Sequence, residues 1–232
     1  MRHYEIMANG SIPYFQNIEA CPVNTMALLP KHLIIQGNVL YNKYKNNNIN
    51  DIDLSECNEL IHKYLVYVKD HLTTIQMARY VLDKAQVTPS RILFLSKDTG
   101  PDYLRCTILH GFKTLFGSNC HDYPKIPHIY KTNTINYSSL YGKGITYTNM
   151  LNSDIHSDSL DSTVEKDIQN KYYDVIIYGS YHRGMPYYDL VYKTYDANKV
   201  ILICGEDEHK CNYTQWTDRG HSVFVRELPH SI

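Results

Sequence analysis

Polar and charged side chains gather in three short loops, each of which follows an apolar run. The loops read SKDTGPDYLR (residues 96–105), GSYHRGMP (179–186) and CGEDEHKC (204–211). If the apolar runs are parallel strands, all three loops emerge at one edge of the sheet, where ligands bind in open α/β sheets. Two glycine turns, basic groups and carboxylates then converge. This combination suits a phosphorylated sugar or a nucleotide.

The chemistry expected of these loops divides into ligand binding and proton transfer. Glycines let a backbone approach a ligand closely, and a guanidinium pairs with phosphate oxygens. Three loop residues are predicted to bind the ligand: Gly179, Arg183 and Gly205. A reaction at such a ligand also needs groups that take up or release protons. Three residues are candidate catalytic acid/base groups: His182, Asp207 and Glu206.

Each of these features also has a purely structural interpretation. Glycine turns after strands are needed simply to reverse the chain. His182 and Arg183 can pair with the acidic residues 206–208, as surface ion pairs worth about 0–1 kcal/mol. The same acidic run suits the N-terminus of a solvated helix, where carboxylates interact favourably with the helix dipole.

Other site types have weaker support in the sequence. Cys204, His209 and Cys211 could suggest zinc, but Cys204 ends an apolar run and no second ligand pair follows at zinc-type spacing. We therefore predict no metal ligands. No P-loop, no G-x-G-x-x-G fingerprint and no G-x-S-x-G elbow occurs in the sequence.

Alternating apolar runs and helical patterns predict the elements that position the loops. Apolar runs of four to six residues that alternate with helices are typical of strands buried on both faces of a parallel sheet. We expect about five strands, one of them weaker, within 91–96, 118–124, 172–180, 199–207 and 221–228. Residues 89–232 are therefore predicted to form a Rossmann-like α/β domain with flanking helices.

Two further zones precede this domain. Residues 54–88 are predicted to form an arm of two consecutive helices with a bend, because Thr73 and Gln76 have capping-box spacing. Residues 1–53 contain a helix-like start, an apolar stretch at 32–41 and the Asn-rich linker KNNNINDID.

Composition limits the partners and the location. A formal net charge of -1 gives no reason to expect nucleic acid as a partner. No apolar run approaches the roughly 20 residues that span a bilayer, and the N-terminus lacks a signal-peptide pattern. The six scattered cysteines suit reduced thiols in a cytoplasmic protein. The 22 tyrosines are attributed to codon bias rather than to a stacking surface.

The opening RHYEIMANGSIPYF resembles the nucleotide-sugar motif of GT-B-type glycosyltransferases of the exostosin-like branch. The positions that match are Glu5, Ala8, Gly10 and Pro13. The resemblance implies that Glu5 binds the donor ribose, that Arg2 lies near the phosphates and that Gly10 lets the backbone come close. A helix–turn–strand with a buried Glu5 is the structural alternative.

Longer segments resemble uncharacterised glycosyltransferase-like proteins of giant DNA viruses, of the mimivirus kind; they include DYLRCTILHGFKTLFGSNCHDYPKIPHIY and YYDVIIYGSYHRGMPYYDLV. This resemblance implies a role in viral glycan synthesis, in host cytoplasm or virion. A GT-B enzyme needs two Rossmann-like domains, whereas here only the tail of a donor domain precedes the helices. We therefore expect a second copy or a partner chain to complete the cleft.

Two functions from different classes follow. The first is a glycosyltransferase-like protein that binds a nucleotide-sugar, with a glycan or protein acceptor and no cofactor beyond that donor. The second is a non-catalytic binding or assembly module, a remnant domain that supports a partner chain.

Overall fold

The computed structural model describes residues 2–22, 25–132, 134–206 and 211–226. The chain divides into two compact units, Met1–Gln76 and Met77–Ile232. Among the described residues, no helix combines the length and the apolar character that a bilayer crossing needs.

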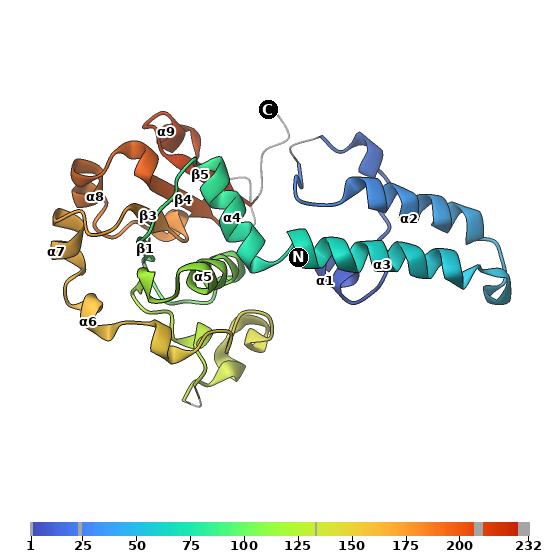
Figure 1. Ribbon diagram of the computed structural model, residues 1–232, viewed down its shortest axis with the longest axis horizontal. Coiled ribbons are helices and arrows are strands. Elements are labelled where there is room, and N and C mark those ends of the chain that lie inside the picture. The colour runs from blue at the N-terminus through green and yellow to red at the C-terminus, as the bar shows by residue number, and fades with distance from the viewer. Residues whose placement is uncertain (1, 23–24, 133, 207–210, 227–232) are drawn as a thin grey trace. The chain divides into compact units, whose positions relative to one another are not determined.

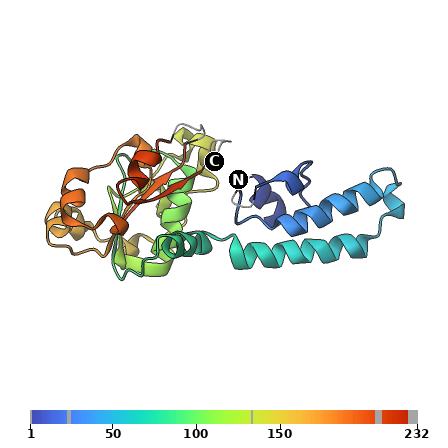
Figure 2. The same ribbon diagram turned by 90° about the horizontal axis from the view of Figure 1, so that it is seen from above.

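The N-terminal unit is helical. Its described residues, 2–22 and 25–76, form α1 (Arg2–Ala8), α2 (Lys31–Tyr44) and α3 (Leu54–His71), with 3-10 turns at Ile18–Ala20 and Ile49–Asp51 and no strand. Asp53 starts α3, because its side chain accepts a hydrogen bond from the Ser55 N–H at 2.9 Å. Helices α2 and α3 run side by side, as Figures 1 and 2 show, around a core that contains Ile34 and Tyr64.

The two consecutive helices predicted for residues 54–88 are present, with a break between them. Helix α3 ends at His71, and α4 (Thr74–Lys84) begins three residues later. The Oγ1 atom of Thr73 accepts a hydrogen bond from the Gln76 N–H at 3.3 Å, which satisfies one of the unpaired amides at the new N-terminus. Ala78 and Val81 of α4 then pack into the core of the C-terminal unit.

The C-terminal unit contains the predicted five-stranded sheet. Its strands are β1 (Ile92–Leu95), β2 (Cys120–Tyr123), β3 (Val175–Tyr178), β4 (Val200–Cys204) and β5 (Ser222–Val225). All neighbouring strands are parallel, in the order β2-β1-β3-β4-β5. Every residue of β1, β3 and β4 is buried, as expected of strands covered on both faces. The Rossmann-like α/β prediction is confirmed.

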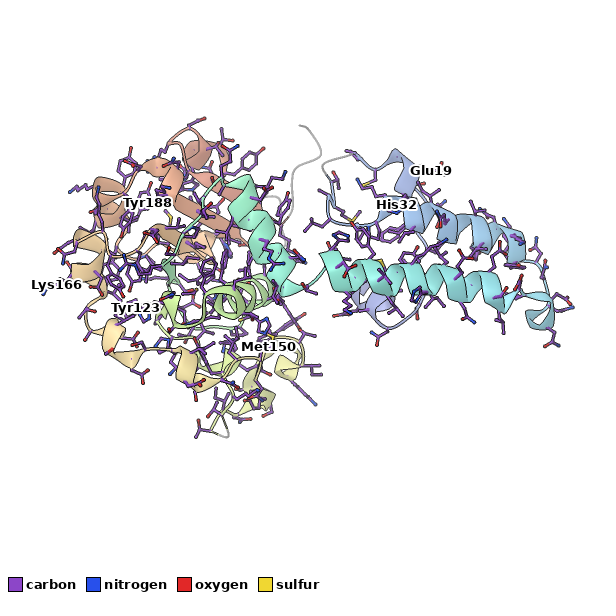
Figure 3. All side chains as sticks on the ribbon, in the orientation of Figure 1. Glu19, His32, Tyr123, Met150, Lys166 and Tyr188 are labelled. Atoms are coloured by element: carbon purple, nitrogen blue, oxygen red, sulfur yellow. A yellow bond between two sulfur atoms is a disulfide. The ribbon has the colours of Figure 1, made fainter. Side chains whose placement is uncertain are left out.

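Helices cover both faces of this sheet (Figure 1). Successive side chains of a strand point to opposite faces. Phe94 and Ile177 therefore pack with α4 and α5 (Tyr103–Phe116), whereas Leu93 and Ile176 pack with α7 (Val164–Gln169) and α8 (Tyr188–Thr194). Side chains fill the space on both sides of the strands (Figure 3).

The remaining elements are short. They are α6 (Asp158–Asp161), α9 (Thr214–Thr217) and 3-10 turns at Gly117–Asn119, Pro127–Ile129, Tyr137–Ser139, Tyr141–Gly144, Ser153–Ile155, Tyr181–Arg183 and Ala197–Lys199. The connection from β2 to β3 contains most of these turns. A bridge between Tyr130 and Leu151 draws this connection together.

The cysteines differ in part from expectation. Cys204 and Cys211 form a disulfide, so the prediction of six reduced thiols is wrong for this pair. The other four are free thiols: Cys21, Cys57, Cys106 and Cys120. Burial raises the pKa of the Cys106 thiol to about 11, which keeps it protonated at neutral pH.

Candidate functional site

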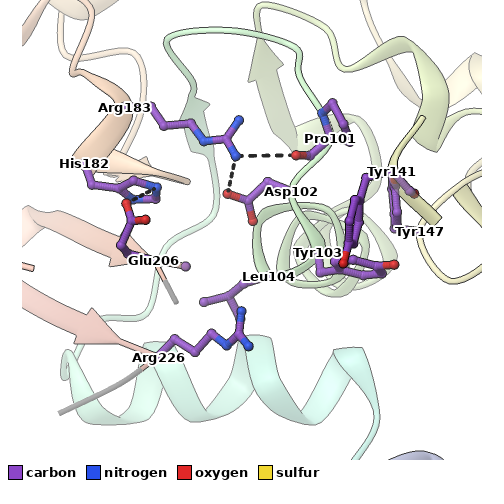
Figure 4. A pocket seen from close by; sticks show the side chains of 11 residues that line it. Pro101, Asp102, Tyr103, Leu104, Tyr141, Tyr147, His182, Arg183, Glu206 and Arg226 are labelled. Atoms are coloured by element: carbon purple, nitrogen blue, oxygen red, sulfur yellow. Dashed lines mark hydrogen bonds and ion pairs between the residues drawn. The ribbon is translucent and has the colours of Figure 1, made fainter. Parts of the chain in front are cut away.

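A pocket of about 350 Å³ opens at the carboxyl edge of the sheet (Figure 4). Loops that follow β1, β3, β4 and β5 all contribute to it. Its lining residues are Pro101, Asp102, Tyr103, Leu104, Tyr141, Tyr147, His182, Arg183, Gly205, Glu206 and Arg226. The strand order reverses between β1 and β3, and this switch point is where doubly wound sheets bind ligands.

Asp102 joins two of these loops at the base of the pocket. It precedes α5, and its Oδ1 atom accepts a hydrogen bond from the Arg105 N–H at 3.0 Å, which makes it the N-cap. Its Oδ2 atom accepts a hydrogen bond from the Ser180 hydroxyl at 2.8 Å. The carboxylate therefore fixes the loop after β3 to the start of α5.

A buried arginine holds the loop after β1. The guanidinium of Arg105 donates to the carbonyl oxygens of Asp98, at 3.0 Å, and Gly100. It also lies 3.3 Å from Asp98 Oδ1. Burial alone raises the pKa of Asp98, but the Gly100 N–H and the Arg105 charge outweigh burial and lower it overall. Arg105 is fully buried, so its charge stabilises the loop and is not available to a ligand.

Arg183 lines the pocket and, unlike the buried Arg105, is accessible to a ligand. Its side chain is 36% exposed and lies 3.5 Å from Asp98 and 3.7 Å from Asp102. It also donates a long hydrogen bond to the Pro101 carbonyl, at 3.4 Å (Figure 4). Because these contacts are long, an anionic ligand can compete for the guanidinium with little loss of internal bonding.

His182 and Glu206 form a polar pair on the facing wall. The His182 Nε2 and Glu206 Oε2 atoms lie 3.5 Å apart. Among the described residues, His182 Nδ1 is buried without a hydrogen-bond partner. Burial lowers the pKa of His182 although Glu206 acts to raise it, so the ring is neutral near pH 7. A neutral imidazole beside a carboxylate can take up a proton.

Aromatic side chains form another wall. The ring of Tyr103 meets Tyr141 and Tyr147 edge to face, with centroid distances of 5.8 and 4.7 Å. The Tyr147 hydroxyl donates to the Tyr141 carbonyl at 2.6 Å, which fixes the turn that carries them. Such a wall offers apolar faces for a nucleobase or a sugar ring.

Four of the predicted residues line this pocket: His182, Arg183, Gly205 and Glu206. Gly179 does not. A Cβ atom there would overlap the Phe94 ring and come within 3.0 Å of Arg105 Cγ, so the glycine is required for packing. Asp207 lies outside the described residues.

The predicted N-terminal residues, Arg2, Glu5 and Gly10, belong to the N-terminal unit. Gly10 has a φ of +70° and follows α1, and the Ser11 N–H bonds to the Ile6 carbonyl at 3.1 Å. This is the left-handed end that glycine commonly gives a helix. Glu5 is exposed, so the alternative of a buried Glu5 is wrong. The Arg2 side chain lies outside the described part of the chain.

Sequence reasoning missed the tyrosine wall and Arg226. The tyrosines were attributed to codon bias, and Tyr141 and Tyr147 lie in an irregular segment whose path no pattern predicts. Arg226 directly follows β5, so the rule that sites gather at strand ends could have found it.

Comparisons with known proteins find no match among family models, curated proteins or solved structures. Any functional inference therefore depends on the geometry of the pocket and on the chemistry of the residues that line it.

Proposed function

We propose that the switch-point pocket binds a phosphorylated ligand of the nucleotide-sugar class. The observation that carries the proposal is the position of an exposed arginine opposite an aromatic wall at the carboxyl edge of a parallel sheet. In this proposal Arg183 and Arg226 contact the phosphates, and Tyr103 and Tyr141 contact the base or the sugar ring.

Glycosyl transfer is the reaction that the polar pair supports best. The bond between the sugar and the phosphate breaks, the acceptor hydroxyl forms a new bond to the sugar, and its proton passes to a base. His182 is that base in this proposal, since burial keeps it neutral, and Glu206 stabilises the imidazolium that forms. Asp207 as a catalytic group, and Arg2, Glu5 and Gly10 as donor contacts, stay predictions.

A second candidate is a binding module without turnover, and the charge balance of the pocket favours it. Arg183 already faces two carboxylates, and His182 already faces Glu206. The volume, about 350 Å³, is near the lower end of the ~300–1,000 Å³ usual for ligand pockets. A nucleotide or a sugar phosphate alone fits the charge balance and the volume of this pocket as well as a nucleotide-sugar donor does.

Isothermal titration calorimetry with UDP, GDP and their sugars tests the binding proposal. Loss of a charged hydrogen bond costs about 1.5–3 kcal/mol, so Arg183→Gln should weaken binding about 10- to 100-fold. Lys166→Gln, an exposed change on α7, is the matched control and should leave affinity unchanged. If none of these ligands binds, or if Arg183→Gln binds equally well, the proposal is wrong.

Release of nucleoside diphosphate separates the two candidates. An enzyme should release it when sugar donor and acceptor are both present, and His182→Gln should abolish release while nucleotide affinity stays within about twofold. Binding without release in the unmodified protein would favour the non-catalytic module.

A further inference from the structure

A second cluster of ligand-type side chains lies at the outer strand β2, and none of its residues lines the pocket. It comprises His121, His156 and Asp161. His121 belongs to β2, His156 follows the 3-10 turn Ser153–Ile155, and Asp161 ends α6. The cluster therefore shares no residue with the proposed nucleotide site.

The two imidazole rings are held against each other. Their centroids are 5.1 Å apart with an interplanar angle of 28°. The Nδ1 atom of His156 lies 2.9 Å from Asp122 Oδ1, whereas its Nε2 atom faces Asp161. His156 thus contacts two successive residues of β2, an outer strand whose successive side chains point to opposite faces of the sheet.

Two of the three distances between the ligand atoms match those around a small metal ion. Asp161 Oδ1 lies 3.1 Å from His121 Nε2 and 3.3 Å from His156 Nε2. Atoms that bind Zn²⁺ at ~2.0–2.1 Å in tetrahedral geometry are about 3.3 Å apart. All three ligand atoms lie within 4.8 Å of one another.

Two of these atoms, His121 Nε2 and Asp161 Oδ1, are buried without a hydrogen-bond partner in the described part of the chain. The side chain of His121 is 2% exposed. A buried polar atom without a partner costs about 1–3 kcal/mol and calls for an explanation, such as an ion. A cation between the two atoms would satisfy both.

Asp122 supplies the support that metal-binding histidines usually have. Its Oδ1 atom accepts hydrogen bonds from Tyr130, at 2.6 Å, and from His156, and it lies 2.8 Å from the Lys113 ammonium. The bond from His156 fixes the proton on Nδ1 and leaves the Nε2 lone pair for a metal. Carboxylate–histidine–metal arrangements of this kind orient the ring and increase its basicity.

We propose that His121, His156 and Asp161 bind a divalent transition-metal ion of the zinc type through Nε2, Nε2 and a carboxylate oxygen. Two imidazoles and one carboxylate suit Zn²⁺, whereas Mg²⁺ and Ca²⁺ prefer oxygen ligands. Asp158 Oδ1 lies 3.6 Å from His156 Nε2 on an exposed side chain, so it or a water molecule completes the coordination.

Calorimetric titration of the chelator-treated full chain with ZnCl₂ tests the proposal, and CoCl₂ provides a visible absorption band that reports the ligand set. We expect one ion per chain. His121→Gln and Asp161→Asn should each weaken binding at least about tenfold, which is the usual effect of losing a ligand or its support. The control His62→Gln, an exposed histidine on α3, should bind as the unmodified chain does.

Circular dichroism of each variant shows whether it is folded. Asp161, at 33% exposure, is the ligand that can change with least effect on packing, so Asp161→Asn keeps the test decisive if His121→Gln does not fold. Failure of the unmodified chain to bind either ion one to one would overturn the proposal, as would unchanged affinity in folded Asp161→Asn. In that case His156 links Asp122 and Asp161 through hydrogen bonds alone.

Discussion

Acidification is expected to destabilise the C-terminal unit through His121. Burial lowers the pKa of this histidine to about 4 in the folded chain, from an ordinary value of 6.5. The other charged groups that act on it are Asp122, His156, Asp161 and Lys113. Between these two pKa values the unfolded chain binds more protons than the folded chain, so stability falls as the pH falls.

The size of the effect follows from the difference in pKa. One unit corresponds to about 1.4 kcal/mol, so His121 should remove about 3 kcal/mol of unfolding free energy between pH 7 and pH 4. This contribution is fully present above pH 6.5 and declines as the pH approaches 4. A loss of this size is a large share of the 5–15 kcal/mol typical of a folded protein, roughly a fifth to three fifths.

Urea denaturation followed by circular dichroism, at a series of pH values with EDTA present, measures the loss. His121→Gln has no titrating ring, so its stability should fall by about 3 kcal/mol less than that of the unmodified chain over the same range. Groups remote from His121 have the same surroundings in both proteins, so their contributions cancel in the difference. Parallel curves for the two proteins would refute the argument.

Two further substitutions test the packing around the sites. Lys113→Met leaves the buried carboxylate of Asp122 without its ammonium partner at 2.8 Å and should lower the unfolding free energy by about 3–5 kcal/mol; in urea denaturation, part of the loss should return in Lys113→Met/Asp122→Asn. Gly179→Ala places a methyl group against Phe94 and should lower the unfolding free energy by about 1–3 kcal/mol by the same measurement, and full stability would contradict the packing role.

The parallel sheet could be predicted from the sequence, because strands buried on both faces are short, continuous apolar runs. Strands β1, β3 and β4 have this pattern, and β2 was found only as a weaker strand because its residues are Cys-His-Asp-Tyr. Helix α2 was recognised only as an apolar stretch. Its Gly37 disfavours a helix, and the structure accounts for it through close approach of Ile12 and Tyr64.

Sequence could predict the candidate site residues only where the α/β fold fixes the position of the loop that carries them. Loops at strand ends must converge, which was enough to predict His182, Arg183 and Glu206 in one pocket. Gly179 shows the limit of this reasoning, since a glycine in such a loop can serve packing instead of binding. The histidine cluster was not predicted, because His121 lies within a strand and His156 follows an irregular connection 35 residues later.

The position of the short strand β2 at the outside of the sheet also affects how molecules of this protein interact with one another. An outer strand offers unpaired backbone groups to any other chain, and this is a common route to aggregation. β2 is only four residues long and carries the buried charge of Asp122, whose partners come from its own surroundings. Because β2 is short and its Asp122 side chain is already paired within the chain, β2 is a poor template for a strand from a neighbouring molecule.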